Sequence, residues 1–126
     1  MKQSLLGVYP LGYENIDVFL MPHSTGGEFY LCPSAIDRAR IKIGLDYHTW
    51  SEVVAVTLHE ALEFALTRKD LRFSQTSKLM QDSGDYLFVM THPQFHQACC
   101  HVAEFLASAL PDLAKAYSKA KKAKGS

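Results

Sequence analysis

Residues 49–69 have the sequence TWSEVVAVTLHEALEFALTRK, and this stretch decides the fold. Thr49 and Glu52 are three residues apart, which is the spacing of a capping box, so a helix is predicted to begin here. The residues that follow are mostly apolar, and we therefore expect a central, largely buried helix. The cations Arg68 and Lys69 favour its end, because the C-terminus of a helix carries partial negative charge.

The segments on either side of this helix predict an α+β fold. The β-prone runs 16–21, 28–32 and 40–44 are bounded by turn residues and predict a small N-terminal sheet, antiparallel or mixed. A second capping box at 91–94 and a helical apolar stripe predict a C-terminal helix, which Pro111 is expected to bend. We expect the sheet to pack on both helices.

A chain of 126 residues is long enough for one domain, which we expect to span 1–114. Residues 70–90 have the weakest pattern and are interpreted as a β-hairpin or a partly ordered lid. The lysine-rich segment 115–126 is expected to be a frayed helix end, with a nucleic-acid-binding tail as the alternative. Without the five lysines of this segment, 8 basic side chains face 13 acidic ones. An excess of acidic side chains in the rest of the chain argues against binding to a nucleic-acid phosphate backbone.

The candidate functional residues on the predicted central helix are His59, Glu60 and Glu63. His59 and Glu63 are four residues apart, so on a helix they project from one face and can hold one ion. Glu60 lies about 100° around the helix and can reach a metal-bound water, as in the H-E-x-x-H zinc helix. A divalent cation would offset the burial of these charges on so apolar a helix. The alternatives are that the acids face a solvent edge, or that His59 and Glu63 simply pair.

A catalytic zinc needs a third protein ligand and an open position for water. His92 is the best candidate, because it lies in the first turn of the second predicted helix, although it can equally be a residue of the capping turn. His96, one turn further, is the alternative ligand or a partner that orients one. His101 is expected to be solvated. Two imidazoles and a carboxylate also suit iron, manganese or nickel.

Residues 57–63 (TLHEALE) resemble the metal-binding helix of minimal zincin-type metallopeptidases, in particular small phage and prophage proteins whose helix has the pattern H-E-x-x-E. Those proteins place a further His in a Ser-His or Thr-His step that opens the next helix. Residues 91–95 (THPQF) are similar to that step. The resemblance covers roughly residues 38–106 and implies a zincin-like fold in which strand 40–44 leads into the active-site helix.

The resemblance also implies the roles of the residues: His59, Glu63 and His92 become zinc ligands, and Glu60 becomes the general base. The Glu at the second ligand position departs from true peptidases, and its negative charge makes the metal a weaker Lewis acid. Glu60 would take a proton from the bound water and pass it to the leaving amine. Tyr86 and His96 are candidates to stabilise the oxyanion.

The sequence therefore predicts a zinc-dependent, peptidase-like hydrolase acting on a peptide or protein. The alternative is a non-catalytic zincin-like scaffold or interaction protein of a phage or mobile element. No apolar run reaches the roughly 18 residues of a membrane span, so a cytoplasmic location is expected. The thiols of Cys32, Cys99 and Cys100 are expected to be reduced and mostly packed.

Overall fold

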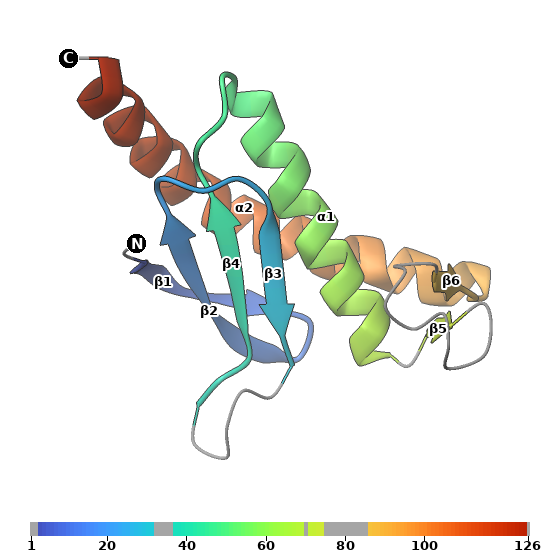
Figure 1. The fold of residues 1–126 in the computed structure, drawn as a ribbon. Helices are drawn as coiled ribbons and strands as arrows, with labels where there is room; N and C mark the ends of the chain where they lie inside the picture. Colours follow the sequence, from blue (N-terminus) through green and yellow to red (C-terminus); the bar gives the residue numbers. More distant parts are fainter. Residues whose placement is uncertain (1–2, 32–36, 70, 75–85, 126) are drawn as a thin grey trace.

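A computed structural model of the chain describes residues 3–31, 37–69, 71–74 and 86–125. It confirms the α+β class, with a four-stranded mixed sheet and two helices (Figure 1). The elements in chain order are β1 Ser4–Leu11, β2 Glu14–Met21, β3 Gly27–Tyr30, β4 Arg40–Gly44, α1 Trp50–Arg68, β5 Arg72–Ser74, β6 Tyr86–Phe88 and α2 His92–Gly125. Neither helix, within the described ranges, is long and apolar enough to cross a membrane.

The four-stranded sheet has the order β1-β2-β4-β3. β2 pairs antiparallel with β1 and parallel with β4, and β3 pairs antiparallel with β4. Strand β1 is additional to the three predicted strands. Gly7 and Pro10 interrupt its β pattern, and the pairing shifts register between Leu5 and Gly7. An edge strand tolerates both features, because one side of it needs no partner strand.

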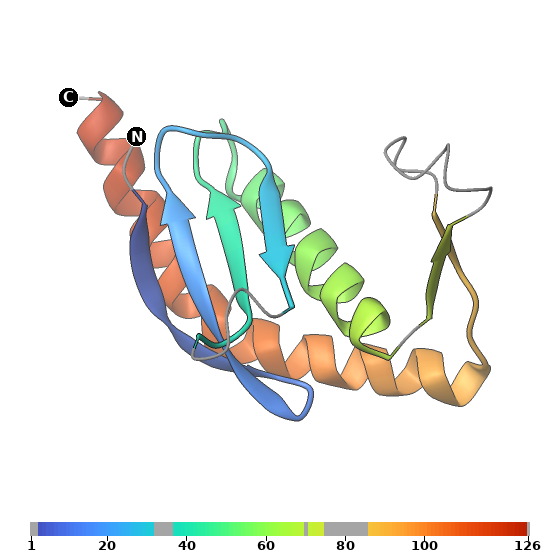
Figure 2. The same cartoon turned by 60° about the horizontal axis from the view of Figure 1, so that its bottom comes forward.

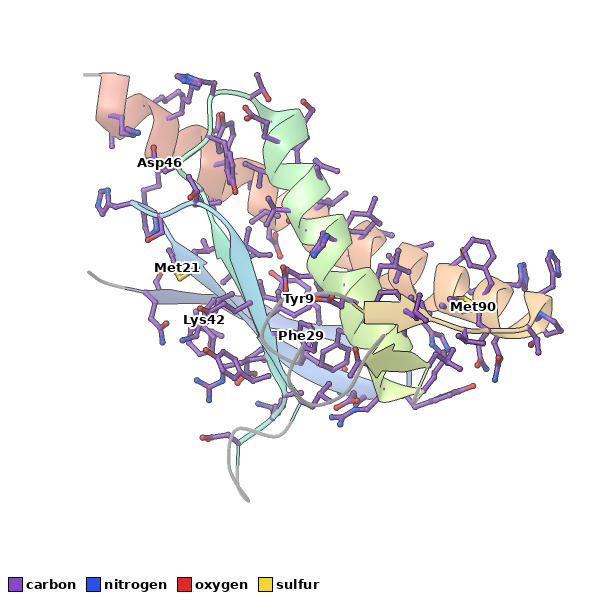
Figure 3. The ribbon with its side chains drawn as sticks, turned by 45° about the vertical axis from the view of Figure 1, so that its right-hand side comes forward. Tyr9, Met21, Phe29, Lys42, Asp46 and Met90 are labelled. Atoms are coloured by element: carbon purple, nitrogen blue, oxygen red, sulfur yellow. The ribbon has the colours of Figure 1, made fainter. Side chains whose placement is uncertain are left out.

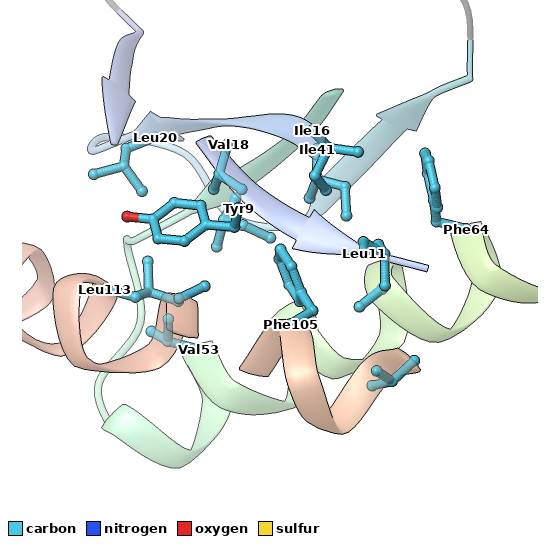
Figure 4. Packing of buried hydrophobic residues seen from close by; sticks show 14 of the residues in the cluster. Tyr9, Leu11, Ile16, Val18, Leu20, Ile41, Val53, Phe64, Phe105 and Leu113 are labelled. Atoms are coloured by element: carbon cyan, nitrogen blue, oxygen red, sulfur yellow. The ribbon is translucent and has the colours of Figure 1, made fainter. Parts of the chain in front are cut away.

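Both helices pack on one face of the sheet and form a core with it (Figure 4). β2 alternates as a half-buried strand does, with Ile16, Val18 and Leu20 turned inward. Phe64 of α1 and Phe105 of α2 are at most 1% exposed, so each helix contributes one large side chain to the centre. The layers are therefore held together mainly by apolar burial.

α1 begins and ends at the predicted residues. The Thr49 hydroxyl accepts a hydrogen bond from the backbone N–H of Glu52, and the Glu52 carboxylate accepts one from the Thr49 N–H. Arg68 is the last helical residue, and its guanidinium donates two hydrogen bonds, of 2.7 and 2.9 Å, to the carboxylate of Glu14. The capping box is thus confirmed, and a charge-assisted contact fixes the C-terminal end of α1 against the start of β2.

α2 is longer than expected. It is 34 residues long and continues through Pro111, and Figure 2 shows that its direction changes along its length. A proline inside a helix removes one backbone donor and produces such a bend. The segment expected to fray is helical as far as Gly125. The Tyr117 hydroxyl donates to the Tyr47 carbonyl at 2.8 Å, and Lys124 pairs with the Asp46 carboxylate, so the loop after β4 anchors it.

The helices α1 and α2 run antiparallel. The rings of Trp50 and Tyr117 pack 5.9 Å apart at one end, and Lys69 donates a 2.7 Å hydrogen bond to Gln97 at the other. The N-terminal part of α2 therefore extends past the C-terminal end of α1. There it lies beside β5 and β6, which project away from the main sheet (Figure 2).

Strands β5 and β6 pair antiparallel, with Phe88 opposite Arg72. This is consistent with the predicted hairpin at 70–90, but residues 75–85, where the turn was expected, lie outside the described residues. A small second cluster, formed by Leu66, Leu71 and Ala98, holds this pair of strands against the helices. Met90 packs on the same cluster, at the end of the molecule away from Asp46 (Figure 3).

Candidate functional site

The side chains of His59, Glu60 and Glu63 lie together on α1, as their spacing along a helix requires. The Nε2 atom of His59 lies 3.9 Å from Oε1 of Glu63 and 4.0 Å from Oε2 of Glu60. The His59 side chain is 67% exposed, that of Glu63 is 21% exposed and that of Glu60 only 9%. Exposure therefore decreases across the cluster, from an accessible imidazole at the surface to a carboxylate buried below it.

Glu60 is buried because α1 approaches strand β3 very closely. A Cβ atom on Gly27 would lie 2.8 Å from Cγ of Glu60, 3.0 Å from the backbone oxygen of Lys42 and 3.1 Å from Cγ1 of Val56. Glycine at this position is what allows the helix and the strand to meet. Further along the strand, Phe29 turns toward α1 (Figure 3) and packs edge-on against Phe64 at 6.1 Å.

The environment of Glu60 disfavours its ionised form. Burial, above all, raises the pKa of this carboxyl, and the neighbouring carboxylates of Glu63 and Glu28 raise it further. His59 acts in the opposite direction, since a nearby imidazolium would favour the carboxylate. A carboxyl whose pKa is shifted toward neutrality by its surroundings is typical of a general acid or base.

An open cleft of about 300 Å³ adjoins this cluster. It is lined by Gly26, Gly27, Ala55, Val56, His59 and Glu60. β3 is an edge strand of the main sheet, so its outer row of backbone groups can pair with an extended peptide. The cleft thus places an imidazole and a buried carboxylate next to a peptide-pairing edge.

His92 is not brought to this cluster. His59 lies ten residues before Lys69, about 15 Å back along α1, whereas His92 lies five residues before Gln97, about 7 Å in the opposite direction. The two imidazoles are therefore on the order of 20 Å apart. His96, one turn nearer, is also remote from His59. The reason is that α2 starts beyond the C-terminal end of α1 instead of beside its middle.

Within the residues that the structure describes, no three His, Cys, Asp or Glu side chains are grouped so that they could hold a metal. The cluster on α1 brings together His59 and Glu63, two of the three ligands expected from the sequence, and Glu60, the expected base. The side chain of Tyr86 lies outside the described residues.

Two further expectations are corrected. His101 is only partly exposed: its ring packs on Tyr13 at 5.0 Å, and its Nδ1 lies 3.4 Å from Nζ of Lys69. Burial, and then the Lys69 cation, lower the pKa of His101. Cys99 and Cys100 are exposed, not packed, because the N-terminal part of α2 extends beyond the core. Cys32 lies outside the described residues.

Sequence reasoning missed Gly27 and Glu28. The pair Gly26-Gly27 has the composition of a turn, yet Gly26 alone has the positive φ of a turn, at 79°, while Gly27 begins β3. The only signal in the sequence was a second glycine directly before a β-prone run, which is compatible with a close approach of another element.

No protein-family model, curated protein or solved structure matches this chain. The function of this chain is therefore inferred from the geometry of the cleft and from the residues that line it.

Proposed function

We propose that this protein is a metal-dependent hydrolase of peptides, related in design to the zincins, in which α1 is the metal-binding helix. His59 and Glu63 are the ligands on this helix and Glu60 is the general base. The observation that carries the proposal is the buried carboxylate of Glu60, which lies within 4.0 Å of an exposed imidazole in a cleft along an edge strand. A buried acid of this kind is unfavourable for stability and is therefore expected to serve a function.

The donor set fits a metal in part. Two ligand atoms on a tetrahedral zinc, at the usual bond lengths, are roughly 3.3 Å apart. The 3.9 Å between Nε2 of His59 and Oε1 of Glu63 needs only small rotations to reach this value. His92 does not fill the third position in this arrangement of the helices. A bound zinc would supply a Lewis acid and an acidified water.

The roles of the chain's own residues follow from their surroundings. Strand β3 would align an extended peptide by backbone pairing, which fixes the direction of the chain along the cleft. Glu60 would accept a proton from the attacking water and deliver it to the leaving amine. Its raised pKa suits this task, because a base titrating nearer to the working pH can both take and return the proton.

The second candidate is a non-catalytic peptide-binding module. The observation that favours it is the distance of His92 from His59, which leaves only two of the expected ligands on α1 in the described part of the chain. The edge of β3 and the cleft would then bind a peptide segment without cleaving it. In that case Glu60 would tolerate replacement by Gln without loss of function.

Metal content and peptide cleavage distinguish the two. Elemental analysis of the full chain, after zinc is offered and the excess removed, is expected to find metal that His59→Ala and Glu63→Ala lose and Glu60→Gln keeps. Cleavage of an unbiased peptide mixture is expected to disappear in Glu60→Gln. If neither His59→Ala nor Glu63→Ala changes the metal content, the hydrolase proposal is wrong. Running His92→Ala alongside tests whether this residue joins the site when metal is present.

A further inference from the structure

A second pair of metal-ligating side chains lies on the exposed N-terminal part of α2. The Sγ atom of Cys100 lies 3.6 Å from Nε2 of His96, one helical turn before it. Both residues are exposed, and His92 lies one more turn toward the start of the helix. This pair is remote from the cleft on α1 and plays no part in the proposed hydrolysis.

The separation within the pair is that of two ligands on one tetrahedral zinc. With a Zn–N bond of about 2.0 Å and a Zn–S bond of about 2.3 Å, the two ligand atoms lie roughly 3.5 Å apart. The observed 3.6 Å therefore needs no rearrangement of either side chain. An imidazole and a thiolate together favour zinc over the hard cations Mg²⁺ and Ca²⁺, which prefer oxygen.

Within the described residues, the pair is incomplete as a metal site. A structural zinc has four protein ligands, and the described part of this chain groups no third His, Cys, Asp or Glu with these two. A second molecule can supply the two missing ligands. A second copy of this chain supplies the required number, because a twofold axis presents the same patch twice and gives two imidazoles and two thiolates.

The surface around the pair suits such an association. Residues 86–103 include no Lys, Arg, Asp or Glu, so two copies can approach without repulsion between formal charges. Several large apolar side chains in this part of the chain are exposed: Phe95, next to His96 in the sequence, is 48% exposed, Val89 59% and Leu87 45%. This part of α2 projects from the body of the molecule together with β6, which leaves it accessible to a second copy (Figure 2).

We propose that His96 and Cys100 are one half of a zinc site that joins two copies of this chain, with the same two residues of the second copy completing a tetrahedral N₂S₂ centre. The thiol of Cys100 loses its proton to solvent as the S–Zn bond forms, and no electron transfer is involved. The exposed ring of Phe95, next to His96 in the chain, becomes covered at the interface.

The test uses the full chain in the presence of a non-thiol reductant, which prevents disulfide-linked dimers. Sedimentation equilibrium with zinc, and then with excess chelator, measures the molecular mass. Cobalt serves as the spectroscopic probe, since a thiolate ligand gives a sulfur-to-cobalt charge-transfer band and a tetrahedral site gives intense visible bands. We expect a dimer with about one thiolate-ligated metal ion per two chains, in addition to any metal bound at α1, and we expect the dimer to dissociate when the metal is removed.

Single substitutions distinguish this site from metal bound elsewhere on the chain and from association that needs no metal. Cys100→Ser and His96→Ala are expected to abolish both the charge-transfer band and the dimer, while Cys99→Ser, an exposed thiol one residue away, keeps both. A dimer that survives chelation, a band carried by a monomer, or a band that Cys100→Ser leaves intact would each overturn the proposal. The cluster on α1 has no cysteine, so His59→Ala leaves the band unchanged, and either proposal can fail without the other.

Discussion

Replacing Gly27 by Ala tests the contact that buries Glu60. The added methyl group meets the Cγ of Glu60 at 2.8 Å, a backbone oxygen at 3.0 Å and the Val56 side chain at 3.1 Å. Side chains could turn away, but the backbone oxygen of Lys42 cannot, because β4 is an inner strand of the sheet. Overpacking of this kind destabilises a protein by about 1–3 kcal/mol, and we expect Gly27→Ala to lower the free energy of unfolding in urea by that amount.

The same substitution should change the pKa of Glu60. Separating α1 from β3 admits water, and the loss of burial lowers the pKa of this carboxyl toward its ordinary value. NMR titration of the side-chain carboxyl measures the shift directly.

Gly26→Ala is the matched control. Gly26 has a φ of 79° and nothing within 4 Å of an added Cβ, so alanine there is strained by about 1–2 kcal/mol without touching Glu60. Both variants should lose similar stability, and only Gly27→Ala should move the pKa. An unchanged pKa in Gly27→Ala, or an equal shift in both variants, would refute the argument that this contact is what buries the carboxylate.

Two further predictions concern Glu60 and the end of α2. Because the pKa of Glu60 is raised by folding, the native state holds this proton more tightly than the unfolded chain, so stability falls as the pH rises from the ordinary glutamate pKa through the raised one. Glu60→Gln should remove that part of the fall in urea unfolding curves measured across this pH range, and a wild-type pH dependence that persists in the variant would contradict the assignment. Deleting residues 115–126 removes Tyr117, which is 8% exposed and hydrogen-bonded to the Tyr47 carbonyl, so we expect a loss of about 3–5 kcal/mol by the same assay. Tyr117→Ala should reproduce most of this loss, whereas a truly frayed end would leave the stability unchanged.

Features that depend on neighbouring residues were accessible from the sequence. The capping box at Thr49 was predicted and is present, and so is the second one, in which Thr91 and Gln94 exchange hydrogen bonds of 2.8 and 3.3 Å. The approach of His59 to Glu63 follows from helical periodicity, which brings residues four apart onto one face. The α+β class followed from the change of hydrophobic period along the chain.

Features that depend on distant residues were not accessible. Nothing near residues 115–126 indicates that a tyrosine there reaches a carbonyl 70 residues earlier in the chain, yet that contact belongs to the ordered helix end. The same is true of Gly27, whose requirement for glycine comes from Glu60, on another element. The position of His92 depends on where α2 starts relative to α1, which is set by the packing of Lys69 against Gln97 and not by any local pattern.

The sequence by itself determined that α1 exists, where it begins, and that His59, Glu60 and Glu63 lie together on it, because backbone hydrogen bonding and a fixed period of 3.6 residues act over a few positions. Only the tertiary structure decided that Glu60 is buried against β3, that His92 lies at the far end of the molecule, and that His96 and Cys100 are exposed together. These outcomes depend on which surfaces exclude water from one another, and that is a property of the packed chain and not of any segment.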